Sequence, residues 1–414
     1  MSRSTFFKIV LSLGLAASVR LVNGADWPQW RGPHRDGISP DTGLLTEWPA
    51  GGPPLAWKAT GIGHGFSSIS VSGSRIFTMG DGPDSSFIYA LDLNGKALWS
   101  AKVGRPGGGD GHPGTRCTPA ASGDLVYAIG QYGDLVCVEA ATGKERWRKN
   151  LNDDFGGRMM SGWGNSESPL VDEDKVLCTP GGSRGTVAAL NKNTGEVIWQ
   201  SKGFNDPAGY SSIITAAIGG VNQYIQLTGA SVAGLATDDG RLLWRASRHG
   251  QTAVVPTPIF HDDCVFVTSG YGVGCNLFKV TKAGDAFTAE QVYANKVMMD
   301  HHGGVILVGE HLYGHSDSQG WVCQEFKTGN LVWGEKQKLG KGSIAYADGH
   351  LYLRSQDRGT VTLIDATPEG FKEKGRFEPP DRSQRDIWAH PVVIGGKLYL
   401  RDQDVLLCYN VKKT

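Results

Sequence analysis

The sequence lacks the charge and cysteine patterns that mark several common classes of protein. Its 41 Lys and Arg residues balance 41 Asp and Glu residues, so no basic field is available to hold a phosphate backbone, and nucleic acid is not expected as a partner. The seven cysteines include no adjacent pair and no Cys-x-x-Cys motif, which leaves no metal-ligand spacing. Their number is odd, and most lie in apolar runs such as Leu135-Val136-Cys137-Val138. We therefore expect the cysteines to be unpaired and buried, where they pack as small hydrophobic side chains.

The sequence also lacks an apolar run long enough to span a bilayer. Ile9–Val19 follows a basic start and is interrupted by Arg20, whereas a spanning helix needs about 20 apolar residues. This pattern predicts a secretory signal over residues 1–24, cleaved after Gly24 or Ala25, and no cysteine lies nearby to carry a lipid. The mature protein is then expected in the periplasm or outside the cell, without a membrane span, and a monomer is the default expectation.

Glycine and tryptophan are abundant, and they recur together. The chain has 59 Gly and 12 Trp residues with only 20% charged residues, which favours an all-β fold with many tight turns. The segment Gly133–Trp147 repeats in Gly185–Trp199, each with an alternating strand, a Thr-Gly turn and a strand that carries the Trp. Copies end at Trp57, Trp99, Trp147, Trp199, Trp244, Tyr293, Trp333 and Phe377.

The spacing of these copies predicts an eight-bladed β-propeller of four-stranded antiparallel blades. The last copy, from His390, supplies three strands and then lacks its Trp strand, while Leu55–Lys58 has that strand's pattern without a blade of its own. We expect the two ends of the chain to share one blade and close the ring, which leaves no open edge. Residues 55–414 then form the propeller, and residues 25–54 a non-repeat cover packed on it. The Trp residues are expected to pack between neighbouring blades.

The Thr-Gly-x-x-x-Trp ending resembles the repeat of the PQQ-like propellers, and the resemblance covers nearly the whole mature chain. That family has two branches. In quinoprotein alcohol dehydrogenases the ring centre holds pyrroloquinoline quinone (PQQ) and Ca²⁺, whereas BamB-like proteins are non-enzymatic scaffolds that take part in inserting outer-membrane proteins. Asp26–Pro33 and His301–Gly304 are also similar to segments of exported PQQ-like propellers of planctomycete-type bacteria.

The residues that begin each blade are the candidate site, because the innermost strands of a propeller line its channel. If the channel holds a cofactor, Asn165 and Glu167 are candidate Ca²⁺ ligands, and Glu167, Asp300 and His301 are candidate catalytic groups. Polar residues that satisfy strand ends in a wet channel are the alternative interpretation. The candidate cofactor-binding residues are Arg116, Trp163, Asn165, Tyr210, Lys341, Trp388 and His390.

The run Asp300-His301-His302 is a candidate transition-metal site, since imidazoles are common metal ligands. Adjacent strand residues point to opposite faces, so both imidazoles bind one ion only from a loop, with a third ligand from His64, His315 or His390. A turn that shapes the channel rim is the alternative. The Gly-rich stretch Pro106–Gly111 precedes no helix and is interpreted as a surface loop rather than a phosphate-binding loop.

The resemblance implies two functions of different classes. The first is an exported, non-enzymatic, BamB-like scaffold or binding protein that recognises a protein, peptide or glycan through its faces and channel. The alternative is a PQQ- and Ca²⁺-dependent alcohol or sugar dehydrogenase, and a hydrolase or lyase stays open. The chain departs from the dehydrogenases in its shorter length, its lack of an adjacent Cys pair and its lack of Cys-x-x-Cys-His for haem. These departures favour the binding protein.

Overall fold

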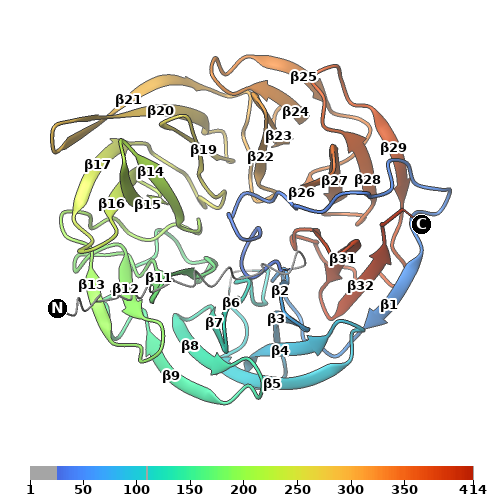
Figure 1. Cartoon of the computed structure of the whole chain (residues 1–414), viewed down its shortest axis with the longest axis horizontal. Coiled ribbons are helices and arrows are strands. Elements are labelled where there is room, and N and C mark those ends of the chain that lie inside the picture. Colours follow the sequence, from blue (N-terminus) through green and yellow to red (C-terminus); the bar gives the residue numbers. More distant parts are fainter. Residues whose placement is uncertain (1–25, 109–110, 414) are drawn as a thin grey trace, which may run out of the picture.

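The computed structural model describes residues 26–108 and 111–413. The predicted signal at residues 1–24 and both expected cleavage positions lie outside them. The described chain folds into a ring of eight four-stranded antiparallel sheets and contains no helix (Figure 1). The prediction of an all-β, eight-bladed propeller is confirmed. None of the described residues forms a helix that is long and apolar enough to cross a membrane.

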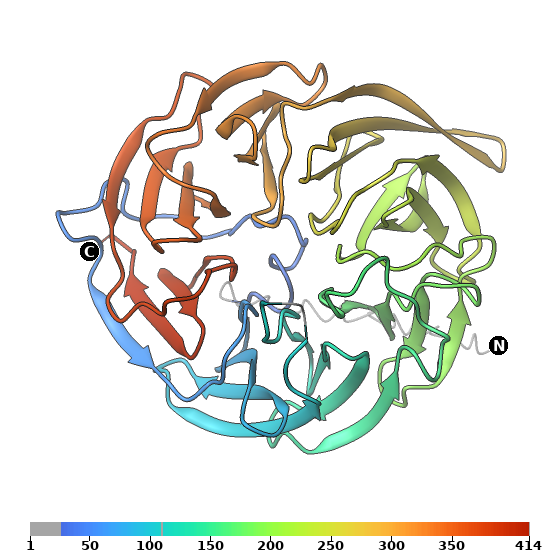
Figure 2. The same ribbon diagram turned by 180° about the vertical axis from the view of Figure 1, so that it is seen from behind.

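Each blade runs outward from the channel, with its first strand innermost and its fourth at the rim (Figures 1 and 2). Blades 1 to 3 contain β2 (Ser70–Ser72), β3 (Arg75–Asp81), β4 (Ser86–Asp92) and β5 (Ala97–Gly104); β6 (Ala120–Ser122), β7 (Leu125–Ile129), β8 (Asp134–Glu139) and β9 (Glu145–Asn150); β10 (Leu170–Asp172), β11 (Lys175–Cys178), β12 (Ala188–Asn191) and β13 (Val197–Gln200). Blades 4 to 6 contain β14 (Ile214–Ile218), β15 (Val221–Leu227), β16 (Ser231–Ala236) and β17 (Leu242–Ser247); β18 (Ile259–His261), β19 (Cys264–Ser269), β20 (Gly274–Ala283) and β21 (Ala286–Asn295); β22 (Val305–Val308), β23 (His311–Ser316), β24 (Gly320–Glu325) and β25 (Leu331–Glu335). Blade 7 contains β26 (Gly342–Ala347), β27 (His350–Ser355), β28 (Val361–Asp365) and β29 (Glu373–Phe377).

Blade 8 joins the two ends of the chain, as the repeat predicts. Its inner strands are β30 (Val392–Ile394), β31 (Lys397–Asp402) and β32 (Val405–Asn410), and β1 (Leu55–Ala59) is the outermost strand. Trp57 of β1 lies opposite Cys408 of β32 in an antiparallel ladder. The ring is therefore closed by backbone hydrogen bonds between strands that are almost the whole chain apart in sequence.

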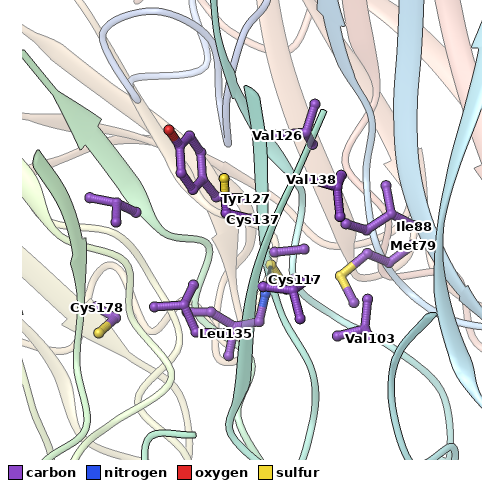
Figure 3. Close-up of a cluster of buried hydrophobic side chains, with 14 of the residues drawn as sticks. Met79, Ile88, Val103, Cys117, Val126, Tyr127, Leu135, Cys137, Val138 and Cys178 are labelled. Carbon is purple, nitrogen blue, oxygen red and sulfur yellow. Dashed lines mark hydrogen bonds between the residues drawn. The ribbon is translucent and has the colours of Figure 1, made fainter. Parts of the chain in front are cut away.

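The middle strands of a blade are buried on both faces, because every blade is packed between two others. In β8, residues Leu135 to Val138 are all buried, which explains the unbroken apolar run in the sequence. Figure 3 shows these side chains meeting Met79 of blade 1 and Cys178 of blade 3. Cys117, Cys137 and Cys178 are free and buried there, as expected, and burial raises the pKa of the Cys117 thiol to about 12.

The rim strands are largely exposed, and in most blades their aromatic residue packs on the next blade. In β9 only Trp147 is buried, and its Nε1 donates a hydrogen bond to the carbonyl oxygen of Lys192 in blade 3 (3.0 Å). Gly195 of blade 3 has a φ of 74°, and a Cβ there lies 2.7 Å from the Trp147 ring. The repeat therefore needs glycine at this turn for two reasons, the backbone conformation and the approach of the indole.

Residues that precede β1 cross one end of the ring (Figure 1). Trp27 exchanges two backbone hydrogen bonds with Val71 of β2, both 2.8 Å. Arg31 donates from Nη2 to the Val305 carbonyl oxygen (2.6 Å) in blade 6. Arg35 donates from Nη2 to the carbonyl oxygen of Ser168 (2.7 Å), which lies just before the first strand of blade 3. The segment thus ties blades 1, 3 and 6 together across the channel.

Candidate functional site

A cavity of about 170 Å³ lies at the channel, among residues that precede the innermost strands. Arg116 precedes β6, Trp163 precedes β10, Tyr210 precedes β14, and Trp388 precedes β30. The repeat places one such loop from every blade around the axis, which is why residues far apart in sequence meet here. The lining side chains are Trp30, Phe66, His112, Arg116, Trp163, Ser166, Ser168, Tyr210, Ser212, Ala253, Val255, Tyr271, His301, His302, Trp388 and His390.

Aromatic rings supply most of the walls. Phe66 and Trp388 are stacked, with ring centroids 4.2 Å apart, and the His112 ring lies 4.9 Å from Trp388. Trp30 belongs to the segment that crosses the ring; its Nε1 donates to Thr257 Oγ1 (2.9 Å), and its ring lies 4.5 Å from His390. These contacts hold broad apolar faces in fixed positions, as in sites that recognise a ring of a ligand.

The two cations of the site are already engaged by the protein. Arg116 donates from Nη1 to the Trp163 carbonyl oxygen (2.8 Å) and from Nη2 to the His112 carbonyl oxygen (2.7 Å). Burial lowers the pKa of Arg116 to about 10. Lys341 Nζ lies 2.9 Å from Asp317 Oδ1 and also contacts His301 Nδ1. A ligand would therefore compete with these partners for the hydrogen-bond donors of both cations, although Arg116, whose partners are uncharged, keeps its positive charge.

Three histidines of the wall are neutral imidazoles. His390 Nε2 lies 2.9 Å from the His302 carbonyl oxygen and must donate to it, because a carbonyl oxygen only accepts. Burial lowers the pKa of His390 to about 3 and that of His301 to about 4, and it holds the pKa of His302 well below the usual value. At neutral pH these rings carry no charge.

The candidate acidic groups lie behind the wall rather than on it. Glu167 is 4% exposed, and both its carboxylate oxygens accept hydrogen bonds from Thr179, one from the hydroxyl (2.7 Å) and one from the backbone N–H. Asp300 is fully buried and accepts from the Gly304 N–H (3.1 Å). Burial raises the pKa of each carboxyl group to about 7.

The donor set does not fit Ca²⁺ bound to PQQ. Ca²⁺ takes six to eight oxygen ligands, carboxylates above all, and no carboxylate belongs to the described residues that line the cavity. Asn165 does not line the cavity either, and its Nδ2 donates to the Gln131 carbonyl oxygen (3.2 Å). Of the ten predicted site residues, the structure brings Arg116, Trp163, Tyr210, His301, Trp388 and His390 into the wall, with Lys341 behind His301. Asn165, Glu167 and Asp300 are not among them.

The histidines do not gather into a metal site either. Within residues 26–108 and 111–413, the one group of at least three His, Cys, Asp or Glu side chains with ligand atoms mutually within 4.8 Å is His261, Asp262 and Glu310, which lies elsewhere on the ring. His64 is on another surface hollow, beside Asp81. The pair His301-His302 therefore lacks the converging third ligand that a metal requires.

Several lining residues are not among the candidates that the sequence predicts, and three of them are aromatic residues that shape the wall. Trp30 belongs to the expected cover segment, and the structure places its side chain in the cavity wall. Phe66 follows a Gly-His-Gly stretch at the start of blade 1, and that stretch was the available signal. Tyr271 lies in the turn between β19 and β20, with a φ of 57°, and no blade-start pattern marks it.

Comparison with known proteins identifies the family. The family described as outer membrane protein assembly factor BamB matches residues 84–335, which is more than half of the chain. The chain belongs to this family. Its expected membership of the PQQ-like repeat propellers is thereby confirmed. A BamB of Shewanella oneidensis is 23% identical over 356 residues, which cover 73% of this chain and 85% of that protein.

Proteins of the dehydrogenase branch are similar too, over shorter stretches of sequence. The lanthanide-dependent methanol dehydrogenase of Methylacidiphilum fumariolicum is 30% identical over 158 residues, 35% of this chain and 24% of that protein. The crystal structure of the quinohemoprotein alcohol dehydrogenase from Comamonas testosteroni superposes with a TM-score of 0.64 at 12% identity, covering 94% of this chain and 81% of that one. At that identity the likeness to the dehydrogenase concerns the fold alone, so function must be argued from the site.

Proposed function

We propose that the protein is an exported, non-enzymatic propeller that binds a protein, peptide or glycan through its faces and its central cavity. The observation that carries the proposal is the character of the cavity wall, which offers stacking surfaces and hydrogen-bonding groups while its cations are engaged by the protein. Membership of the BamB family supports it, since the S. oneidensis relative named as an assembly factor matches over most of its length.

The groups that acid–base chemistry needs are poorly placed for it. His301 has a pKa of about 4, so it is a weak base at neutral pH. The carboxyl groups of Glu167 and Asp300 are buried behind the wall and already hydrogen-bonded. A wall that is largely aromatic, with its acidic groups behind it, is suited to recognition.

Export and the boundaries of the parts belong to the same proposal. We place a cleaved signal at residues 1–24, a cover segment at 25–54 and the propeller at 55–414, with the mature protein a monomer in the periplasm or outside the cell. The hydrogen bonds of Trp27, Arg31 and Arg35 to blades 1, 3 and 6 support a cover that folds with the ring. N-terminal sequencing of the protein purified from its native compartment tests the cleavage position.

Ligand screening of the mature protein tests the binding function. Arrays of peptides and glycans are to be probed with the wild type, with Trp163→Ala, which removes one wall of the cavity, and with Leu98→Ala on the exposed rim strand β5. We expect a ligand whose binding is lost in Trp163→Ala and kept in Leu98→Ala. Ligands that bind all three proteins equally would place recognition outside the cavity, and an absence of ligands from both arrays would contradict the proposal.

A PQQ-dependent dehydrogenase is the second candidate, favoured by the flat Phe66–Trp388 stack and by the similarity to a methanol dehydrogenase. Titration with PQQ and Ca²⁺, followed by dye reduction with alcohols and sugars, tests it. Saturable quinone binding together with substrate-dependent dye reduction would establish this function. Because the donor set does not fit Ca²⁺, we expect neither.

A further inference from the structure

We infer that the ligand of the central cavity is a neutral sugar ring, one residue of a glycan. The inference rests on the binding function proposed above and narrows it to one chemical class. Four features of the cavity carry it: a tyrosine hydroxyl with an oriented proton, a set of serine hydroxyls, aromatic rings with unpaired nitrogen atoms, and a size and charge that suit one uncharged ring.

The first feature is a chain of contacts that orients the hydroxyl of Tyr271. Asp317 Oδ1 holds Lys341 Nζ at 2.9 Å, and Lys341 contacts His301 Nδ1. An ammonium group only donates hydrogen bonds, so His301 Nδ1 accepts. The proton of the neutral imidazole is then on Nε2, which lies 2.6 Å from the Tyr271 oxygen and donates to it. Tyr271 keeps its own O–H for another acceptor, and its side chain lines the cavity.

The backbone at Tyr271 supports a functional placement. Its φ of 57° lies in the left-handed region, which a residue with a side chain adopts at a cost. Glycines stand on both sides in Gly270-Tyr271-Gly272, yet the central position of this turn carries the aromatic side chain. Strained positions of this kind are found where a side chain must be held at a site.

The second feature is a set of hydroxyl groups from Ser166, Ser168 and Ser212. Ser212 Oγ accepts from the Ser168 N–H (3.0 Å), and no hydrogen bond that its own proton donates is found among the described residues. Ser168 Oγ accepts from the Thr118 N–H (2.9 Å), and its hydroxyl interacts with the buried Cys117 thiol. A sugar hydroxyl both donates and accepts, so it matches such groups.

The third feature is unsatisfied nitrogen atoms behind the aromatic faces. Trp388 Nε1, His302 Nδ1 and His390 Nδ1 are buried and have no hydrogen-bond partner in the described part of the chain, although their side chains line the cavity. An unpaired buried polar atom destabilises the protein. A sugar hydroxyl that reaches these nitrogens would satisfy them, whereas an apolar side chain of a peptide would leave them unpaired.

Size and charge complete the match. Pockets that enclose a drug-sized ligand hold about 300–1,000 Å³, and this cavity of about 170 Å³ is smaller, as suits a single ring. The apolar face of a sugar ring packs on aromatic side chains such as Trp163. No carboxylate lines the cavity to meet an amine, the three histidines are neutral, and Lys341 is paired with Asp317. Arg116 keeps its charge, but an acidic ligand would have to compete with the carbonyl oxygens of Trp163 and His112 for its two terminal nitrogens. This favours an uncharged sugar over a carboxylate or an amine.

Calorimetry and saturation-transfer NMR with defined probes test the inference. The neutral probes are glucose, galactose, mannose and N-acetylglucosamine with their disaccharides; glucuronic acid and glucosamine carry charge; N-acetyltryptophanamide stands for a peptide side chain. We expect a neutral sugar to bind and the charged analogues to bind no tighter. Tyr271→Phe should weaken that binding roughly three- to tenfold, and Trp163→Ala about tenfold or more. Tyr346→Phe, the same chemical change away from the cavity, should have no effect.

Lys341 acts through His301 and is tested as a positioning residue. Lys341→Met should weaken sugar binding about as much as Tyr271→Phe, and Lys341→Arg, which also only donates, should restore most of it. In the Tyr271→Phe background, Lys341→Met should have no further effect, because the oriented proton is already gone. A merely structural role of Lys341 would instead give additive losses.

The outcomes separate this inference from the proposed function. Binding of the tryptophan amide with no binding of any neutral sugar overturns the sugar inference and leaves the binding propeller standing. Sugar binding that is unchanged in Trp163→Ala and Tyr271→Phe also overturns it, because the sugar is then elsewhere. If neither the probes nor the peptide and glycan arrays give a ligand, both fail.

Discussion

Glu167→Gln tests whether the buried carboxyl group behind the cavity is structural or a metal ligand. Glutamine keeps the size and an acceptor oxygen for the Thr179 N–H but carries no charge. Burial raises the pKa of Glu167 from 4.5 to about 7 in the folded protein, with the Thr179 hydrogen bonds and Arg35 opposing that rise. The group is wholly buried, so the full difference applies: about 3 kcal/mol, at 1.36 kcal/mol per pH unit.

The sign follows from proton binding. In the unfolded chain this carboxyl loses its proton near pH 4.5, and in the folded protein near pH 7, so between these values the folded state holds more protons. The free energy of unfolding of the wild type therefore falls as the pH rises through that window. Glu167→Gln has no carboxyl group to titrate, so it does not lose this stability. The free energy of unfolding of the variant minus that of the wild type should therefore rise by about 2–3 kcal/mol from about pH 5 to pH 8.

Urea unfolding of both proteins at the two pH values, followed by far-UV circular dichroism, measures the difference. Asp300 has a raised pKa in both proteins, so its contribution cancels. A relative stability that stays constant, or moves against Glu167→Gln at the higher pH, would refute the reasoning and indicate an ionised carboxylate paired with Arg35. The same measurement in the presence of Ca²⁺ tests whether Glu167 is a metal ligand. Stabilisation of the wild type alone by Ca²⁺ would make Glu167 a calcium ligand after all.

Three further predictions concern the ring and its cavity. Gly195→Ala should destabilise the protein by about 2–4 kcal/mol, because the backbone there is left-handed and the new Cβ clashes with the indole of the preceding blade. Gly123→Ala, at a φ of 59° with open space around it, should cost only about 1–2 kcal/mol. Equal urea midpoints of the two variants would contradict the packing of the indole on the next blade. Arg35→Met should cost about 3 kcal/mol in urea unfolding, because it leaves two buried carbonyl oxygens unpaired, and an unchanged midpoint would show that the cover segment does not tie the ring. Ligand binding measured by calorimetry should weaken below about pH 5, where the buried imidazoles gain protons; full binding that persists at pH 3 would contradict a role for the neutral His390 and His301 rings.

The fold was predictable because each repeat contains its own signal within a short stretch of sequence. A turn glycine and a rim tryptophan recur in most blades, and each copy has the same physical reason, the contact of the indole with the next blade. The missing strand at one end and the spare strand at the other predicted the pairing of β1 with β32. Hydrophobic runs such as Leu135–Val138 indicated buried middle strands without any knowledge of their neighbours.

The candidate site was only half predictable. Reading the first residues of each blade found Arg116, Trp163 and His390, because the topology carries every blade start to the channel. The same reading included Glu167, whose residue type suggested a ligand although its carboxylate turns to Thr179. It omitted Tyr271, because that residue enters the cavity from a turn between the second and third strands of a blade.

The repeats along the chain are enough to predict the number of blades, the closure of the ring and the set of loops around the channel. Which polar groups remain available to a ligand is visible only in the folded ring. Arg116 and Lys341 are cations in the sequence, but the Trp163 carbonyl oxygen that holds Arg116 and the Asp317 carboxylate that holds Lys341 come from neighbouring blades. A side chain's chemistry is local, whereas its burial and its hydrogen-bond partners depend on segments that meet only when the ring closes.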